Sequence, residues 1–382
     1  MNLVAEVNIA LGNILDYWEK QSIDHEYGGF VGQRDHDDVL VPNAPKGAVL
    51  NSRILWTFAA AYAYTNNIAH RQLADSAYQY LKNYFYDKDY GGVYWSVDFK
   101  GKPLDTKKQT YALSFAIYGL TEYFKISKNQ EVLDLAISLF RDIEQYSFDK
   151  KNSGYFEAFG REWQEIADLR LSEKDANEKK TMNTHLHVIE AYANLYRVWP
   201  NSELELQIKN LLSDFKNHMI DADTKHLILF MNENWEAKEM IYSYGHDIEA
   251  GWLLLEAAEV IGDKVLIKSF KKLAIGLAEA ALEGIDKDGS LWYEYNLSKS
   301  HLIKEKHWWV QAEAMVGFIN AWEISKQEKY FQIAEKLWEF IHSYIIDHQK
   351  GEWFWGRNSD LSLMESEDKV GLWKCPYHNT RA

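Results

Sequence analysis

An acidic loop that leads into an aromatic segment recurs six times along this 382-residue chain. The copies are roughly sixty to seventy residues apart, a spacing that fits one helix pair and one hairpin-like loop. Between the loops, apolar residues recur with the period of an α-helix, as in Leu50, Ile54 and Phe58. These features predict an all-α ring of six helix pairs, with short β-hairpin-like loops at one end and a single domain over residues 1–382. The six loops begin near Asp24, Asp87, Asp149, Asp221, Asp286 and Asp347.

A ring of helix pairs has an outer layer and an inner layer that is buried nearly all round. Because the inner helices recur at one interval, their first turns should lie at one end of the ring and bring their polar residues together. Two polar segments, 98–108 and 165–180, are expected to be loops over a mouth of the ring. The inner helices are predicted to start near Asn51, Gln109, Asn183, His246, Trp308 and Tyr377.

The composition excludes several classes of protein. A net charge of −15 argues against binding of nucleic acid or anionic membrane, because both ligands require a positive field. No apolar run of about eighteen residues suggests a membrane span, and residues 1–18 have the pattern of a first helix and not of a signal peptide. The single Cys375 excludes an intramolecular disulfide, which is typical of a reducing, cytoplasmic setting. We expect this cysteine to be a packing residue.

The predicted helix starts carry an unusual set of polar side chains. Three of them offer His187, His246 and His378, and the first repeat adds Arg53. A single histidine in a buried helix usually has a structural role, but three around one pocket suit proton transfer near neutral pH. Glu249 lies three residues after His246, close enough along a helix to orient its ring.

The chain has 15 Trp and 24 Tyr. Core packing explains most of them, and we expect about a third of the Trp to line a cleft where flat rings stack on sugars. A metal site is not expected, because His185 and His187 are two residues apart on a helix and point to different sides. The usual metal, dinucleotide and phosphate motifs do not occur, so we expect catalysis without a cofactor.

Three sequence blocks resemble a known family. They are Asp175-Ala176-Asn177 followed by residues 182–187, then residues 244–249, and finally residues 373–381. In order and spacing they are similar to the cellobiose 2-epimerases of the N-acylglucosamine 2-epimerase superfamily, and the similarity spans essentially the whole chain. The resemblance implies an (α/α)6 barrel, in agreement with the six repeats.

The resemblance also implies an activity and roles for particular residues. The reaction would be epimerisation at C2 of the reducing-end glucose in β-1,4-linked disaccharides such as cellobiose and lactose, through a cis-enediolate. Carried over to this sequence, the acid/base pair is His246 and His378. The groups that hold the reacting oxygens are His187 and Arg53. The stacking platforms are Trp309 and Trp373, and the hydrogen-bonding or imidazole-orienting residues are Tyr111, Asn183, Asp175 and Glu249.

Other functions stay open at this point. A mannose 2-epimerase or an aldose–ketose isomerase of the same superfamily would use nearly the same histidines. An inverting glycoside hydrolase would need an acid pair across a cleft, for which Glu190, Asp247, Glu249 and Glu313 are candidates, and a non-catalytic sugar-binding protein would need only the aromatics. We expect a monomer or a weak homodimer. Related chains continue with a last helix after Arg381, so we expect either a short final inner helix or a sequence truncated after Ala382.

Overall fold

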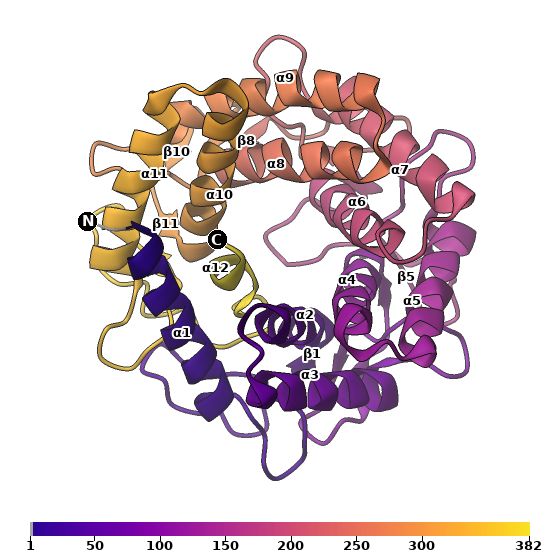
Figure 1. Cartoon of the computed structure of the whole chain (residues 1–382). Helices are drawn as coiled ribbons and strands as arrows, with labels where there is room; N and C mark the ends of the chain where they lie inside the picture. The colour runs from indigo at the N-terminus through magenta and orange to yellow at the C-terminus, as the bar shows by residue number, and fades with distance from the viewer. Residues whose placement is uncertain (1–2) are drawn as a thin grey trace.

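The computed structural model describes residues 3–382, which form twelve α-helices arranged as a closed double ring (Figure 1). The predicted (α/α)6 barrel is confirmed. Met1, the first residue of the predicted first helix, lies outside the described residues. The outer helices are α1 (Leu3–Gln21), α3 (Ile68–Tyr80), α5 (Gln130–Asp142), α7 (Ser202–Asp214), α9 (Lys264–Ala281) and α11 (Glu328–Phe340). The inner helices are α2 (Ala48–Thr65), α4 (Thr110–Ser127), α6 (Met182–Tyr196), α8 (Tyr244–Ile261), α10 (Trp308–Ser325) and α12 (Tyr377–Arg381).

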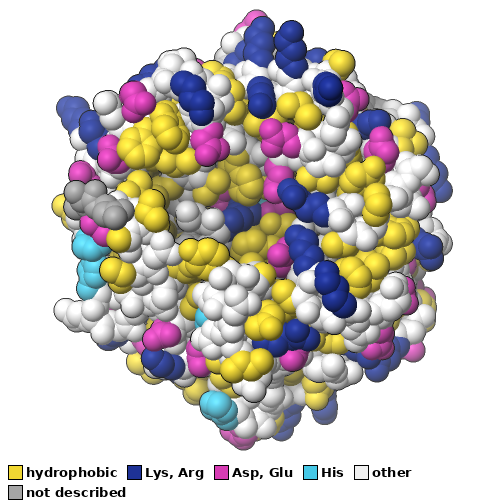
Figure 2. Space-filling model, in the orientation of Figure 1, with side chains coloured by type: hydrophobic (Ala, Val, Ile, Leu, Met, Phe, Trp, Pro, Cys, Tyr) yellow, Lys and Arg dark blue, Asp and Glu magenta, His cyan; other side chains and the backbone are white. Residues whose placement is uncertain are grey.

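The inner helices start within three residues of the predicted positions. Their composition explains their place, because α4 buries side chains on every side whereas the outer α5 buries only one stripe. Close packing of inner helices uses small residues: a Cβ on Gly119 of α4 would lie 2.5 Å from the carbonyl oxygen of Ser52 in α2. The last inner helix, α12, has only five residues. The centre of the ring is hollowed on the face shown in Figure 2, with hydrophobic, acidic and basic side chains around the hollow.

Six hairpin-like loops connect each outer helix to the next inner helix, so all of them lie at the end where the inner helices start. The aspartate at the start of each loop accepts backbone N–H groups within the next three residues, as Asp87 does from Asp89 and Tyr90. A bridge pair then closes each loop. The six bridges are Ile23 with Phe30, Tyr86 with Val93, Phe148 with Tyr155, Ile220 with Leu227, Ile285 with Leu291 and Ile346 with Trp353.

Buried lysines fasten these loops to the ring. Lys108, two residues before the start of α4, is fully buried and lies 2.9 Å from the carboxylate of Asp87. Lys46, Lys180 and Lys306 make the same pairing in their repeats. Because a buried ammonium ion is stable only when it is paired, each lysine fixes the loop at the start of an inner helix.

Short antiparallel strands join neighbouring repeats at the same end of the barrel. The strand before an inner helix pairs with the strand after the next loop, as β4 does with β5. Three sheets contain two strands each, and the other two are β1-β2-β3 and β8-β9-β10. The strands are β1 (Lys46–Gly47), β2 (Ser96–Val97), β3 (Pro103–Asp105), β4 (Lys108–Gln109), β5 (Ala158–Phe159), β6 (Lys180–Thr181), β7 (Phe230–Met231), β8 (Ile241–Ser243), β9 (Glu294–Asn296), β10 (His301–Ile303), β11 (Lys306–His307) and β12 (Gly356–Arg357).

The two predicted mouth loops differ from each other. Segment 98–108 is partly extended, because β3 pairs with β2 and residue 108 belongs to β4. Segment 165–180 has no helix or strand before its last residue, which begins β6. Within residues 3–382, no helix is long and apolar enough to cross a membrane.

Candidate active site

The same register of the six inner helices supplies the polar side chains at the centre of the barrel. We count residues from Lys46 and its equivalents in the other repeats. The fourth residue after this position is His246 in the fourth repeat and His378 in the sixth. The seventh position lies one helical turn deeper. It gives Arg53, Phe115, His187, Glu249, Glu313 and Arg381. Equivalent positions on a ring of parallel helices lie at equal depth, so the site has two layers.

His246 lies in the first turn of α8 and is held by a neutral group. Its Nδ1 atom is 2.8 Å from the hydroxyl oxygen of Ser243, and its ring is 4.7 Å from that of Trp309. Burial lowers the pKa of His246 to about 3, with a further contribution from the neighbouring His187 and His378. A neutral imidazole with a fixed ring plane is suited to act as a base.

His378 lies in the first turn of α12 and is held by a carboxylate. Its Nδ1 atom is 2.6 Å from Oε1 of Glu313, and its ring is 5.8 Å from that of Trp309. Burial lowers the pKa of His378 to about 3, although the hydrogen bond that His378 donates to Glu313 acts in the opposite direction. The two imidazoles therefore come from different repeats and contact the same indole ring.

His187 and Arg53 form a second polar pair, one layer deeper. Nδ1 of His187 is 2.8 Å from Glu190, and its ring makes an edge contact with that of Tyr111 at 5.0 Å. Arg53 donates to the hydroxyl of Tyr111 at 2.9 Å and lies over the ring of Phe115. Arg53 is only 3% exposed, so it brings a permanent positive charge into the site.

For His187, His246 and His378 alike, the described part of the chain offers no hydrogen-bond partner to Nε2. Each ring thus uses Nδ1 for support and leaves Nε2 for another molecule. His185 is different, since Nδ1 is 2.6 Å from the carbonyl of Thr181 and Nε2 accepts from the N–H of Tyr155 at 2.8 Å. It anchors a loop and shares no ligand position with His187.

Glu249 is placed differently from the expectation. Its carboxylate was predicted to orient His246, but Ser243 does this, and Glu249 instead accepts a hydrogen bond from Arg381 at 3.0 Å. The reason is depth: Glu249 lies one turn further along α8, where it faces a residue of another helix. Burial raises the pKa of Glu249 well above its ordinary value, and the nearby Glu313 adds to the effect.

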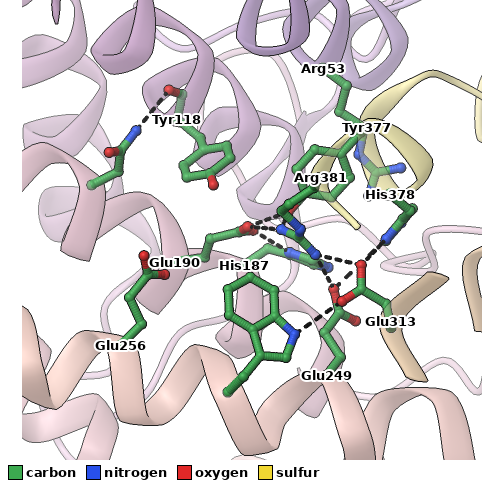
Figure 3. Close-up of polar contacts among 12 residues, drawn as sticks. Arg53, Tyr118, His187, Glu190, Glu249, Glu256, Glu313, Tyr377, His378 and Arg381 are labelled. Carbon is green, nitrogen blue, oxygen red and sulfur yellow. Dashed lines mark hydrogen bonds and ion pairs between the residues drawn. The ribbon is translucent and has the colours of Figure 1, made fainter. Parts of the chain in front are cut away.

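Sequence reasoning missed Arg381 as a site residue. Its guanidinium pairs with Glu190, Glu249 and Glu313 at the centre of the network in Figure 3. Burial by itself would raise the pKa of Glu313, but the charge of Arg381 and the hydrogen bond from His378 outweigh it and lower that pKa. The register would have identified Arg381, because it stands at the same position of the repeat as Arg53 and His187.

The remaining predicted sugar contacts lie around these layers. Trp373 contacts Trp95 and Tyr111, with ring centroids 5.7 and 5.8 Å apart. The Oδ1 atom of Asn183 is buried without a partner among residues 3–382, as expected of a group that awaits a ligand. Asp175 accepts from the N–H of Ser172 at 2.9 Å, and no direct contact within the described chain joins it to the imidazoles.

One cluster has the composition of a metal site. Glu249, Glu313 and His378 offer ligand atoms that lie within 4.8 Å of one another. Arg381 already pairs with both carboxylates, and Nδ1 of His378 is bonded to Glu313. A cation there would have to displace the guanidinium, so this donor set fits a salt-bridge network better than a metal. Catalysis without a cofactor remains a prediction.

The sequence and the fold of this chain are similar to those of known proteins. The sequence matches the N-acylglucosamine 2-epimerase (GlcNAc 2-epimerase) family over residues 28–382. A cellobiose 2-epimerase of Bacteroides fragilis is 50% identical over 368 residues, covering 96% of this chain and 94% of that protein. One from Ruminococcus albus is 40% identical over 381 residues, covering 99% and 97%.

A solved structure is also close to this chain. The cellobiose 2-epimerase of Bacillus thermoamylovorans B4167 superposes with a TM-score of 0.94 at 41% identity, covering 100% of this chain and 98% of that one. The similarity therefore extends over the whole barrel and is not confined to a motif. From the sequence match and the shared barrel together, this chain belongs to the N-acylglucosamine 2-epimerase family.

Proposed function

We propose that this chain, a carbohydrate epimerase by family, inverts C2 of the reducing-end glucose in β-1,4-linked disaccharides such as cellobiose and lactose. The observation that carries the proposal is the pair His246 and His378. They come from different helices, contact the same indole ring of Trp309, and each has Nδ1 held by another group. The names of the similar proteins support cellobiose as a substrate.

The reaction begins once the sugar ring has opened. One imidazole takes the proton from C2, the electron pair of that C–H bond forms the C1–C2 double bond, and the C1 carbonyl oxygen becomes the enediolate oxygen. The opposite imidazole then donates a proton to the other face of C2, and the carbonyl re-forms. Two groups on opposite faces are the simplest way to invert a carbon, since one base would return the proton to the face it left.

The groups around the two imidazoles differ in charge and suggest a different role for each ring. Burial lowers the pKa of both imidazoles to about 3, so the ring that donates the proton must first take one from solvent. Glu313 is hydrogen-bonded to His378 and favours its protonated form, whereas His246 has only a neutral hydroxyl partner. We therefore assign the proton donor to His378 and the base to His246 in one direction, with the roles exchanged in the other.

The deeper layer suits the negative charge of the intermediate. Arg53 would donate to the oxygen on which the enediolate charge develops. His187, whose Nδ1–H donates to Glu190, would use Nε2 to accept from the hydroxyl on the neighbouring carbon. Trp309 and Trp373 are half-buried and present indole faces on which a sugar ring can stack. Two further residues would form hydrogen bonds to the sugar. They are Tyr111, whose hydroxyl accepts from Arg53, and Asn183, whose Oδ1 has no partner within residues 3–382.

The same geometry bears on the alternatives. A mannose 2-epimerase would use the same two rings, and an aldose–ketose isomerase would return the proton to C1 instead of C2. Glycoside hydrolysis needs one carboxyl as acid and another as base or nucleophile. Glu249 and Glu313 are both paired with Arg381, so they do not form a free acid pair, and hydrolysis is disfavoured.

Product analysis in heavy water tests the proposal. The enzyme is incubated with cellobiose, lactose and mannose, and the products are identified by NMR. We expect the C2 epimer of each disaccharide, with deuterium at C2. Ketose as the only product would replace the epimerase assignment by the isomerase one, and released monosaccharide would indicate a hydrolase.

A further inference from the structure

One guanidinium joins the carboxylates that hold two different imidazoles. Arg381 pairs with Glu190, whose other carboxylate oxygen is 2.8 Å from Nδ1 of His187. Arg381 also lies 2.6 Å from Oε1 of Glu313, the same oxygen that is 2.6 Å from Nδ1 of His378. Figure 3 shows Arg381 between these two dyads. A continuous chain of contacts therefore runs from His187 through Arg381 to His378.

The guanidinium is fixed in its plane as well as in its position. Its central carbon lies 4.1 Å from the ring centre of Tyr377 and 4.6 Å from that of Trp252. Both rings also belong to the network, since the hydroxyl of Tyr377 donates to Glu190 and the indole N–H of Trp252 donates to Glu313 at 3.1 Å. Two aromatic contacts and three carboxylates leave the group little freedom, and its side chain is only 8% exposed.

We propose that Arg381 is a positioning residue that couples the imidazoles of His187 and His378 through Glu190 and Glu313. The role rests on the proposed function, because it matters for turnover only if these two rings act on one substrate. Within residues 3–382, the polar contacts of Arg381 are with carboxylates and with the hydroxyl of Tyr377 and not with either imidazole, so its effect passes through the two glutamates. The coupling itself is a property of the protein and can be measured without turnover.

The chemistry of arginine makes the role specific. The planar fork donates from two nitrogens, to Glu190 from one and to Glu249 and Glu313 from the other. A lysine ammonium is a point charge on a flexible stem and cannot keep all three contacts in one plane. Without the cation, the three buried carboxylates would repel one another and would have to rotate or bind protons. Either change alters the hydrogen bond that each imidazole donates to its carboxylate.

Imidazole NMR tests the coupling in the full-length protein without substrate. The side-chain 15N signals of His187 and His378 are assigned by comparison with variants in which one histidine at a time is replaced. In the otherwise native protein, Glu313→Gln should shift the signals of His187 as well as those of His378. In an Arg381→Met background, the same Glu313→Gln change should leave the signals of His187 where they were. Unchanged His187 signals in the native background would overturn the coupling.

Kinetics give the second measurement. Arg381→Lys should lower kcat by about 10- to 100-fold, the usual worth of a hydrogen bond to a charged group, while KM changes little. The matched control is Arg197→Met, which removes an exposed arginine paired with Glu256 at 2.8 Å and should leave kcat unchanged. Native kcat in Arg381→Lys would overturn the positioning role. An inactive native enzyme with intact NMR coupling would instead reject the proposed function alone.

Discussion

The starts of α8 and α12 present imidazoles to the same indole ring, yet they hold them by different means. His246 has a hydroxyl partner, Ser243, that belongs to the strand before its own helix. His378 has a carboxylate partner, Glu313, from the neighbouring α10, and this carboxylate is in turn paired with Arg381. Only the second arrangement stabilises an imidazolium ion. Two imidazoles at equivalent positions of the repeat can therefore differ in how readily they are protonated.

Removing either imidazole should give the largest effect. His246→Ala and His378→Ala are each expected to lower kcat for epimerisation by about 10²- to 10⁴-fold, the usual contribution of a general acid or base. Each variant keeps one base, so in heavy water it should still exchange the C2 proton of the epimer whose proton faces that base. The two variants should therefore exchange opposite epimers, as measured by loss of the C2 proton signal.

The exposed His301 provides the matched control for this pair. His301→Ala, in β10, should have native activity. If both variants exchanged the same epimer, the two rings would not lie on opposite faces of C2. Full activity in either variant would remove that ring from the mechanism.

Replacing the carboxylate behind His378 should give the next largest effect. Glu313→Gln removes a charged hydrogen-bond partner, so we expect kcat to fall by about 10- to 100-fold. Loss of the carboxylate makes His378 harder to protonate, and the pKa of its ring falls further. The pH–rate profile should then shift to lower pH, and the defect should shrink as the pH falls. Glu259→Gln, an exposed change further along α8, is the control. A profile that stays in place would contradict the assigned proton donor.

Replacing the hydroxyl behind His246 should matter less. Ser243→Ala removes a neutral hydrogen bond worth about 0.5–1.5 kcal/mol, which corresponds to about a 2- to 12-fold loss of kcat. Because no charge is lost, the pH–rate profile should keep its position. Steady-state kinetics over the same pH range as for Glu313→Gln compare the two supports directly. A shifted profile in Ser243→Ala would show that the two rings are supported in the same way.

The sequence predicted the barrel because each local signal agreed with the next. The aspartates that open the loops form turns in the structure, and the predicted inner-helix starts bring His187, His246 and His378 to one centre. The partners of these rings were harder to predict. Glu249 shares a helix face with His246, but contacts between helices decide the deeper layer, and there it pairs with Arg381.

A single sequence gives the depth of a residue along a helix but not the angle at which neighbouring helices pack. For that reason Glu313 and Arg381, which stand at the correct depth, had no predicted partners, whereas the structure joins them at 2.6 Å. The support of His246 by Ser243 also escaped prediction, since the serine lies just before the start of α8. Alignment of the six repeats on one another, which the structure makes possible, would have placed Arg381 at the same position as Arg53 and His187.

The loops before α8 and α12 extend the same comparison to stability. Before α12, Lys374 is fully buried and pairs with Glu352 at 2.8 Å. The repeat of α8 has Tyr242 at the lysine position, and its ring stacks at 3.7 Å on that of His226, whose Nδ1 is 2.7 Å from Asp247. The loop before α8 is thus fastened by an imidazole, whose pKa Asp247 and Glu283 raise, where the loop before α12 has a lysine.

The protonation of His226 should give the smallest effect among these predictions. Burial opposes the charge, but Asp247 and the exposed Glu283 outweigh it and raise the pKa of His226 above 6.5. The stabilisation from the charged His226 is therefore complete below about pH 6.5 and is lost as the pH rises through the raised pKa. It also requires an ionised Asp247, whose own pKa is raised by burial. His226→Gln should cost about 1 kcal/mol more unfolding free energy at pH 6 than at pH 8. Denaturant unfolding at both pH values measures this, with His301→Gln as the exposed control. An equal cost at both pH values would show that His226 holds the loop by ring stacking alone. The His226–Tyr242 contact before α8 and the Lys374–Glu352 pair before α12 would then not differ in their response to pH.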